Sequence, residues 1–312
     1  MKNPHSSPRL KGTWDPLVLL ELQKRVLKLR YEQLKMNEML KMNAFPGLPV
    51  HLSIGHEVLA TCIANVKQDG DLFCLSHRNL AYNLALGADF DTVCDLFHSS
   101  LSPDNKSLAG SMNFFDPDIG SIYSSSILGN NLPVAAGAAL SESVKNSQQS
   151  VVFAITGDGA IEEGAFWETL LITAATDLPL IIIVENNNFS LGSTITNRRK
   201  QIDLHLISQG LGASYFYCDS FDLTLTLDSL DRARTDALQN LRPVVVEATV
   251  NTFCNHAGPT PGWPADPKSI TLNTNLTESW FEGDPISQIK KDLGVIAFEQ
   301  FVNELMESRH DG

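Results

Sequence analysis

Two oxygen-bearing side chains follow two neighbouring apolar runs of the chain. Asp158 stands in a Gly-Asp-Gly-Ala sequence after one run, and Asn187 stands in a Glu-Asn-Asn-Asn sequence after the next. A helical stretch separates the runs, so both residues are expected at the carboxyl ends of successive parallel strands, where such sheets bind ligands. Carboxylate and carboxamide oxygens suit Mg²⁺, which in proteins commonly takes its other oxygens from phosphates. The pair therefore predicts a magnesium–diphosphate site.

The residues around this pair fit an anionic ligand. Gly157 and Gly159 let the backbone turn tightly and approach a phosphate. A helix that opens after Ala160 would present unpaired N–H groups and the positive end of its dipole. Since Mg²⁺ needs few protein ligands, the backbone carbonyl of Phe189 would suffice as the third. Gly-Asp-Gly alone is an ordinary turn and an asparagine run an ordinary loop, so only their spacing across one strand–helix–strand unit makes the pair specific.

Strands alternate with helices along the chain. Apolar, β-branched runs predict strands at 72–75, 150–155, 180–184 and 243–250. Amphipathic or small-residue stretches predict helices at 15–41, 56–66, from 79 onward, 134–140, 162–176 and 229–240. This alternation predicts an α/β fold, a doubly wound parallel sheet with helices on both faces. The polar stretches 99–137 and 251–267 are expected to be long loops, which often carry function.

We expect three segments along the chain. We expect residues 1–14 to form a flexible lead and residues 15–268 to form the diphosphate-binding domain. Residues 269–312 predict a helical extension, with two short helices between 284 and 306 that break near Gly294.

The composition narrows the class of protein. Hydrophobic residues make up 43% of the 312 residues, enough for a sizeable core. A formal net charge of −13 disfavours nonspecific binding to nucleic acid or to anionic membranes. The five cysteines are scattered without a Cys-x-x-Cys pair, which is typical of reduced core thiols. With no apolar signal segment and no apolar run near the ~20 residues of a membrane helix, we expect a cytoplasmic protein.

Together these motifs resemble a known family. Gly-Asp-Gly followed by Asn-Asn after one strand–helix–strand unit is similar to the thiamine diphosphate motif. The chain further resembles the alpha subunit of the decarboxylating first component of 2-oxo acid dehydrogenases, such as the pyruvate, branched-chain and acetoin enzymes. The likeness runs from residue 20 to 265 and rests on blocks at 51–57, 110–112, 128–137, 157–168 and 178–187.

The resemblance implies a role for each matching residue. Mg²⁺ would be bound by Asp158, Asn187 and the Phe189 carbonyl. Thiamine diphosphate would lie against a set of cofactor-binding residues: Gly159 and Ala160 through their backbones, Arg78 with its neighbour His77, Leu128 near the aminopyrimidine ring, and Ser126 beside the thiazolium ring. His51 and His256 would be catalytic, because imidazoles near neutrality can hydrogen-bond a substrate carboxylate or shuttle protons.

Several positions depart from the family pattern. His77 stands where tyrosine is usual, and Leu80 and Asn113 stand where histidine is common. Ser126 replaces a usual glycine, and Thr252 stands where basic or histidine residues are frequent. These changes spare the metal and diphosphate residues and alter those that would face the substrate. Cofactor binding is therefore better supported than any particular substrate.

The resemblance implies an oxidoreductase subunit for oxidative decarboxylation of a 2-oxo acid with acyl transfer, often to the lipoyl group of an acyltransferase. It also implies a beta-type partner subunit that supplies the glutamate activating the cofactor, in a heterotetramer. Two alternatives stay open. A transketolase-like half-enzyme would transfer a ketol or acyl unit in specialised metabolism, and a non-catalytic scaffold paralogue would keep only the fold.

Overall fold

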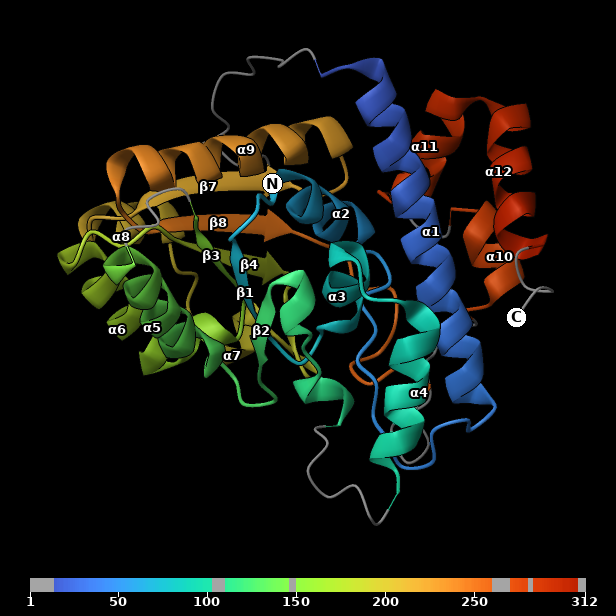
Figure 1. Cartoon of the computed structure of the whole chain (residues 1–312), viewed down its shortest axis with the longest axis horizontal. Coiled ribbons are helices and arrows are strands. Elements are labelled where there is room, and N and C mark those ends of the chain that lie inside the picture. Colours follow the sequence, from blue (N-terminus) through green and yellow to red (C-terminus); the bar gives the residue numbers. More distant parts are fainter. Residues whose placement is uncertain (1–13, 103–109, 146–149, 260–269, 280–282, 308–312) are drawn as a thin grey trace.

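A six-stranded sheet forms the centre of the molecule (Figure 1). The computed structural model describes residues 14–102, 110–145, 150–259, 270–279 and 283–307. All neighbouring strands of the sheet run parallel, which confirms the predicted doubly wound arrangement. In spatial order the strands are β2 (Ser121–Ser124), β1 (Leu72–Leu75), β3 (Val152–Gly157), β4 (Leu180–Asn186), β8 (Val244–Thr249) and β7 (Ser214–Asp219). A small hairpin, β5 (Phe189–Ser190) and β6 (Ser193–Thr194), follows β4.

Helices cover both faces of the sheet because successive strand residues point to opposite sides. In β3, Phe153 and Ile155 pack into one core, and Val152 and Ala154 pack into the other. The first core includes helices α1 (Pro16–Lys41), α2 (Glu57–Val66), α3 (Leu80–Leu86) and α9 (Leu223–Asn240). The second includes α5 (Asn131–Val144), α6 (Gly164–Ala175) and α8 (Leu204–Gly210). The sheet is thus buried on both sides, which explains its apolar strands.

The remaining helices lie outside this sandwich. They are α4 (Phe90–Ser100), α7 (Ile195–Arg198), α10 (Leu272–Thr277), α11 (Pro285–Leu293) and α12 (Val295–Glu307), with short 3₁₀ turns η1 (Ser111–Asn113), η2 (Pro117–Ile119) and η3 (Ala160–Glu162). The last three α-helices pack against α1 (Figure 1). Gly294 separates α11 from α12, as predicted. Buried Arg30 of α1 pairs with Glu57 at 2.8 Å and with Asp284 at 3.1 Å, joining these helices to α2.

The structure corrects several predicted elements. The stretch 99–137 is not a loop throughout, because it contains strand β2 and the start of α5. Strand β7 has no counterpart among the predicted strands: it is an edge strand whose side chains are mostly half-buried, and its aromatic residues lack the β-branched aliphatic run of the central strands. The predicted helix at 162–176 begins as the separate turn η3, and α6 starts only at Gly164 because Glu163 is extended.

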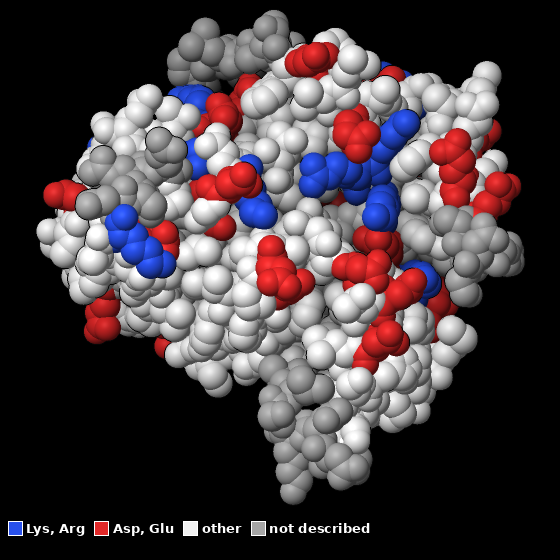
Figure 2. Space-filling view, viewed as in Figure 1, with Lys and Arg blue, Asp and Glu red and all other residues white. Residues whose placement is uncertain are grey.

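The surface and the thiols agree with the composition. On the face in Figure 2, lysines and arginines lie in small groups beside acidic side chains rather than in one continuous basic patch. All five cysteines are buried free thiols. In the described part of the chain, no helix is both long and apolar enough to cross a membrane. The predicted flexible lead lies almost wholly outside the described residues.

Candidate cofactor and substrate site

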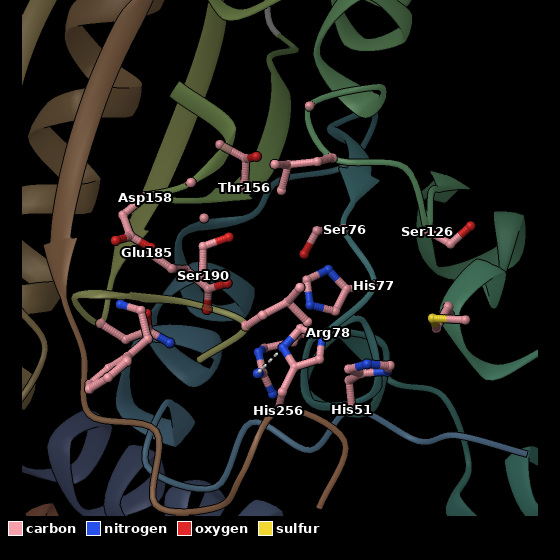
Figure 3. Close-up of a pocket in the computed structure, with 18 of the residues that line it drawn as sticks. His51, Ser76, His77, Arg78, Ser126, Thr156, Asp158, Glu185, Ser190 and His256 are labelled. Carbon is pink, nitrogen blue, oxygen red and sulfur yellow. Dashed lines mark hydrogen bonds between the residues drawn. The ribbon is translucent and has the colours of Figure 1, made fainter. Parts of the chain in front are cut away.

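A pocket opens at the carboxyl ends of β3 and β4 and encloses about 260 Å³ (Figure 3). It brings together residues from loops far apart in the sequence. Among its lining residues are nearly all of those predicted from the sequence: His51, His77, Arg78, Ser126, Leu128, Asp158, Gly159, Asn187, Phe189 and His256. Ala160 is completely buried and does not line the pocket with its side chain.

The two predicted metal ligands lie at adjoining strand ends. Asp158 follows the last residue of β3, and its backbone N–H donates to the Glu185 carbonyl of β4 at 3.0 Å. Asn187 directly follows β4. Burial raises the pKa of Asp158, and a hydrogen bond from Arg198 Nη2 at 3.0 Å to Oδ2 partly offsets that rise. The side chain of Asp158 is 3% exposed, so its charge needs a positive partner.

The donor atoms on this rim fit Mg²⁺. Asn187 Oδ1 accepts a hydrogen bond from the Phe189 N–H at 2.9 Å, which folds the chain back so that both residues line the pocket with Asp158. A carboxylate, a carboxamide and a backbone carbonyl are all hard oxygen donors, the kind that Mg²⁺ prefers. The imidazoles of the same pocket come from other loops, so the oxygen donors are not mixed with nitrogen ligands.

Two glycines shape the pocket for different reasons. A Cβ on Gly159 would lie 2.7 Å from Ser190 Oγ, so packing leaves no room for a side chain there. A Cβ on Gly157 would meet nothing within 4 Å, so this position opens space instead. Neither glycine has a left-handed backbone, so a tight turn is not the reason for either. Gly157 therefore leaves its backbone open towards the pocket, whereas Gly159 packs closely against Ser190.

A chain of hydrogen bonds orients Asn187. The buried Glu185 carboxylate binds His56 Nδ1 and the Tyr82 hydroxyl, each at 2.6 Å. His56 Nε2 lies 2.8 Å from Thr252 Oγ1, which also accepts from Asn187 Nδ2 at 2.8 Å. The pattern closes if Nδ1–H of His56 donates to Glu185 and Nε2 accepts from the threonine hydroxyl. These contacts fix both ends of the carboxamide, because Nδ2 of Asn187 donates to Thr252 and Oδ1 accepts from the Phe189 N–H.

Burial alone would raise the pKa of Glu185. The neighbouring His56 and the hydrogen bonds from His56 and Tyr82 lower it by more than burial raises it, so the net pKa lies below the usual value. Glu185 is therefore an ionised anchor at the base of this chain. A buried carboxylate that accepts two hydrogen bonds holds its partners in fixed orientations.

Three histidines from three loops meet at the other end of the pocket (Figure 3). The ring centroids of His51 and His256 are 4.6 Å apart, those of His51 and His77 are 4.9 Å apart, and those of His77 and His256 are 5.2 Å apart. Arg78 lies beside them and donates from Nη1 to the Leu52 carbonyl at 2.7 Å and from Nη2 to His256 Nδ1 at 3.3 Å. We call His51, His77 and His256 the histidine cluster.

Burial, followed by the charge of Arg78, lowers the pKa of every imidazole in this cluster. The pKa is about 3 for His51, about 2 for His77 and about 4 for His256. All three rings are therefore neutral near pH 7. Each can donate one hydrogen bond and accept another.

The cluster suits an anion better than a cation. Its ligand nitrogens all lie within 4.8 Å of one another, a spacing that could converge on a metal ion. However, a cation bound by His256 would lie beside the Arg78 guanidinium. Two unit charges about 4 Å apart interact by about 4 kcal/mol at an effective dielectric constant of ~20, and a divalent ion doubles that repulsion. An anion such as a carboxylate gains the same interaction instead.

Several residues of the site had no assigned role in the sequence. His56, Tyr82, Thr252 and Arg198 act through contacts with residues distant in the sequence. His56 and Glu185 lie inside the motif blocks, so their positions were visible although their contact was not. Only the basic run Arg198-Arg199-Lys200 after a polar loop gave a signal for Arg198.

The sequence of this chain was compared with known families and proteins. A profile of the family described as Dehydrogenase E1 component matches residues 24–303. The chain belongs to this family. Among relatives, the "Pyruvate dehydrogenase E1 component subunit alpha" of Rickettsia bellii is 26% identical over 268 residues, covering 86% of this chain and 79% of the relative. The protein of the same name in Rhizobium meliloti is 23% identical over 274 residues, covering 88% and 76%.

Solved structures show the same fold in longer chains. A transketolase from Pichia stipitis has a TM-score of 0.59 and 18% identity, and a transketolase from Leishmania mexicana has a TM-score of 0.58 and 14% identity. They cover 92% and 93% of this chain, while this chain covers 46% of each of theirs. This Dehydrogenase E1 component member thus spans about half the length of the transketolase chains whose fold it shares.

Proposed function

We propose that the chain is the alpha-type subunit of a thiamine-diphosphate-dependent 2-oxo acid dehydrogenase. The reaction is oxidative decarboxylation of a 2-oxo acid with transfer of the acyl group to an acceptor. One observation supports this best: Asp158, Gly159, Asn187 and Phe189 line one pocket at the carboxyl ends of β3 and β4, where the sequence motif predicts the diphosphate site. Membership of the family and the names of the relatives agree with it.

The cofactor would be held by the rim and floor of the pocket. Asp158, Asn187 and the Phe189 carbonyl would bind Mg²⁺, and the backbone at Gly159 would lie against the diphosphate. Leu128 is 42% exposed in the pocket and offers an apolar surface for an aromatic ring. When bound, thiamine diphosphate supplies the carbon that attacks a substrate carbonyl and the electron sink for decarboxylation.

The histidine cluster and Arg78 would bind the substrate carboxylate. In this proposal His77 and Arg78 act at the substrate end, whereas the family resemblance implies that both bind the cofactor, Arg78 through its phosphates. Because His256 Nδ1 accepts from Arg78, the proton of the neutral ring is assigned to Nε2. That N–H can donate to a carboxylate oxygen. The buried guanidinium supplies a positive charge that remains when the imidazoles are neutral. The site thus recognises an anion without relying on protonated histidines.

The active unit would include a beta-type partner. The relatives carry the name "subunit alpha", which supports a second kind of subunit. In this proposal the partner provides the glutamate that activates the aminopyrimidine ring, two copies of each subunit form a heterotetramer, and a lipoyl acyltransferase is the acyl acceptor to test first.

Calorimetry and a decarboxylation assay test the proposal together. The full chain, co-expressed with a beta-type chain encoded beside it, should bind thiamine diphosphate only with Mg²⁺ and release CO₂ from at least one 2-oxo acid with an artificial electron acceptor. Asp158→Asn should abolish the binding, and the chain alone should show little turnover. Absence of cofactor binding by the folded complex would support the scaffold alternative. Full turnover by the chain without a partner would contradict the proposal that a partner supplies part of the active site.

A transketolase-like transfer reaction is the second candidate. It is favoured by the hydrogen-bonding character of the substrate end, where three neutral imidazoles lie with Ser76 and Ser126. Neutral donors and acceptors of this kind also suit hydroxyl groups. Turnover of ketose phosphates but not of 2-oxo acids by the same complex would select this reaction.

A further inference from the structure

Arg198 is a charged residue of the diphosphate end that the proposed roles leave unused. Its Nη2 donates to Asp158 Oδ2 at 3.0 Å, and its Nε donates to Glu162 Oε1 at 3.0 Å. Its Nη1 donates to the carbonyl of Ser193. The side chain is 13% exposed, so the guanidinium is held in place at the buried carboxylate.

The neighbouring Arg199 differs in one respect. Its Nε donates to Glu162 Oε1 at 2.9 Å, but no contact with Asp158 is found among the described residues. The two arginines therefore carry the same charge on the same short segment and share one partner. Only Arg198 reaches the carboxylate that would bind the metal.

The charges around Asp158 balance before any ligand arrives. Two carboxylates, Asp158 and Glu162, face two guanidinium groups, Arg198 and Arg199. A divalent cation added to Asp158 would meet the positive charge of Arg198 directly beside it. When a diphosphate binds together with the cation, Arg198 attracts the ligand instead of repelling it. The complex is anionic, and a guanidinium fork pairs well with phosphate oxygens.

Space exists beside Asp158 for such a rearrangement. A second cavity of about 300 Å³ shares Asp158 with the cofactor pocket and is lined also by Asn188, Ile195, Thr196 and Arg199. Ile195 and Thr196 belong to α7, the four-residue helix that ends at Arg198. Asp158, the partner of Arg198, thus lies between two cavities, and the short helix that carries Arg198 borders the second of them.

We propose that Arg198 is a binding residue of the diphosphate site that couples the two ligands. It weakens binding of the bare cation to Asp158 and strengthens binding of the cation–diphosphate complex. The residue thereby disfavours a metal-only state. This inference rests on the proposed function, since it assumes that Asp158 binds the cation of a diphosphate.

Two titrations of the complex between the full chain and its beta-type partner test the coupling. Free Mn²⁺ measured by electron paramagnetic resonance gives the affinity for the cation alone, and calorimetry with preformed magnesium–inorganic diphosphate gives the affinity for the complex. In Arg198→Gln we expect roughly threefold to tenfold tighter Mn²⁺ binding and roughly tenfold weaker binding of the complex, the size of one charge-assisted contact. Arg198→Lys should lie between Arg198→Gln and the wild type.

Arg199→Gln is the matched control and should stay within about twofold of the wild type for both ligands, because Arg199 pairs with Glu162 without a hydrogen bond to Asp158 among the described residues. Opposite shifts of the two affinities in Arg198→Gln cannot arise from a general loss of structure, which would weaken both. Shifts of the same sign, no shift, or equal shifts in Arg199→Gln would overturn the coupling. A folded wild-type complex that binds neither ligand would instead overturn the proposed function on which the coupling rests.

Discussion

The two ends of the pocket are built in different ways. The diphosphate end takes Asp158 and Asn187 from positions just past two paired strands, so its geometry follows from the strand register. The substrate end takes His51, His77 and His256 from three loops that meet only in the folded chain. The first offers oxygen ligands for a cation, and its two carboxylates are balanced by two arginines. The substrate end is neutral apart from the positive charge of Arg78 and therefore suits an anion.

This contrast shows how one pocket can hold ligands of both signs. At the diphosphate end, the buried Asp158 carboxylate pairs with Arg198, and the more exposed Glu162 pairs with Arg198 and Arg199. At the substrate end, burial removes the charge from the imidazoles and leaves a single guanidinium. Perturbing each end should therefore produce a different kind of effect.

The largest effect is expected from removing the metal ligand charge. Asp158→Asn should weaken Mg²⁺-dependent binding of thiamine diphosphate by roughly 100-fold or more, since even outer contacts of metal sites cost about 10–100-fold. Calorimetry on the complex with the partner checks it. Asp231→Asn, which alters an exposed carboxylate on α9, should bind like the wild type. Retained binding of thiamine diphosphate in Asp158→Asn would mean that Asp158 does not bind the cation at the diphosphate end.

The two glycines of the floor should separate packing from ligand binding. Gly159→Ala should lower the free energy of unfolding by about 1–3 kcal/mol, because the new Cβ overlaps Ser190. Gly157→Ala should change it by no more than about 0.5 kcal/mol, because nothing lies near that position. Both should weaken cofactor binding. Chemical denaturation and calorimetry measure the two quantities, and normal cofactor affinity in Gly157→Ala would mean that the open space is not used.

The hydrogen-bond chain behind Asn187 should matter less than the ligands themselves. Thr252→Val removes the acceptor of Asn187 Nδ2 and should weaken metal-dependent cofactor binding by roughly tenfold, the lower range for outer contacts of a metal site. Thr252→Ser keeps the hydroxyl and should restore most of the affinity. Equal affinities in the two variants, measured on folded protein, would show that Asn187 needs no such support.

The smallest effect is expected at the substrate end, in the pH dependence of stability. The pKa of His77 is about 2 in the folded chain and starts from 6.5, so only the unfolded chain binds this proton between those values. The free energy of unfolding should therefore fall as the pH drops below 6.5, by up to about 1.4 kcal/mol per pH unit for this residue.

His77→Tyr should remove that part of the acid sensitivity. Urea denaturation at pH 7.5 and pH 5.5 measures it, and His98→Tyr, which changes an exposed histidine of α4, serves as control. An unchanged difference between the two pH values in His77→Tyr would mean that the ring is not kept neutral by burial.

The fold was predictable where strands are central and apolar. Strands β3, β4 and β8 are buried on both faces, so their residues show a continuous apolar run. The edge strands were not predictable in the same way. β2 has four residues, and β7 is mostly half-buried, so neither needs such a run. The start of α6 was also misplaced, because the extended backbone at Glu163 has no marker in its residue type.

The site, like the fold, has a part that was predictable from local sequence order and a part that was not. The sequence alone determined the positions of Asp158, Asn187 and Gly159, because a residue just past a strand end is placed by the local order of strand, turn and helix. Only the tertiary structure decided that Arg198 pairs with Asp158 and that Thr252 orients Asn187. It also decided that His51, His77 and His256 are neutral. Burial and through-space charges set these properties, and both depend on neighbours that are distant in the chain.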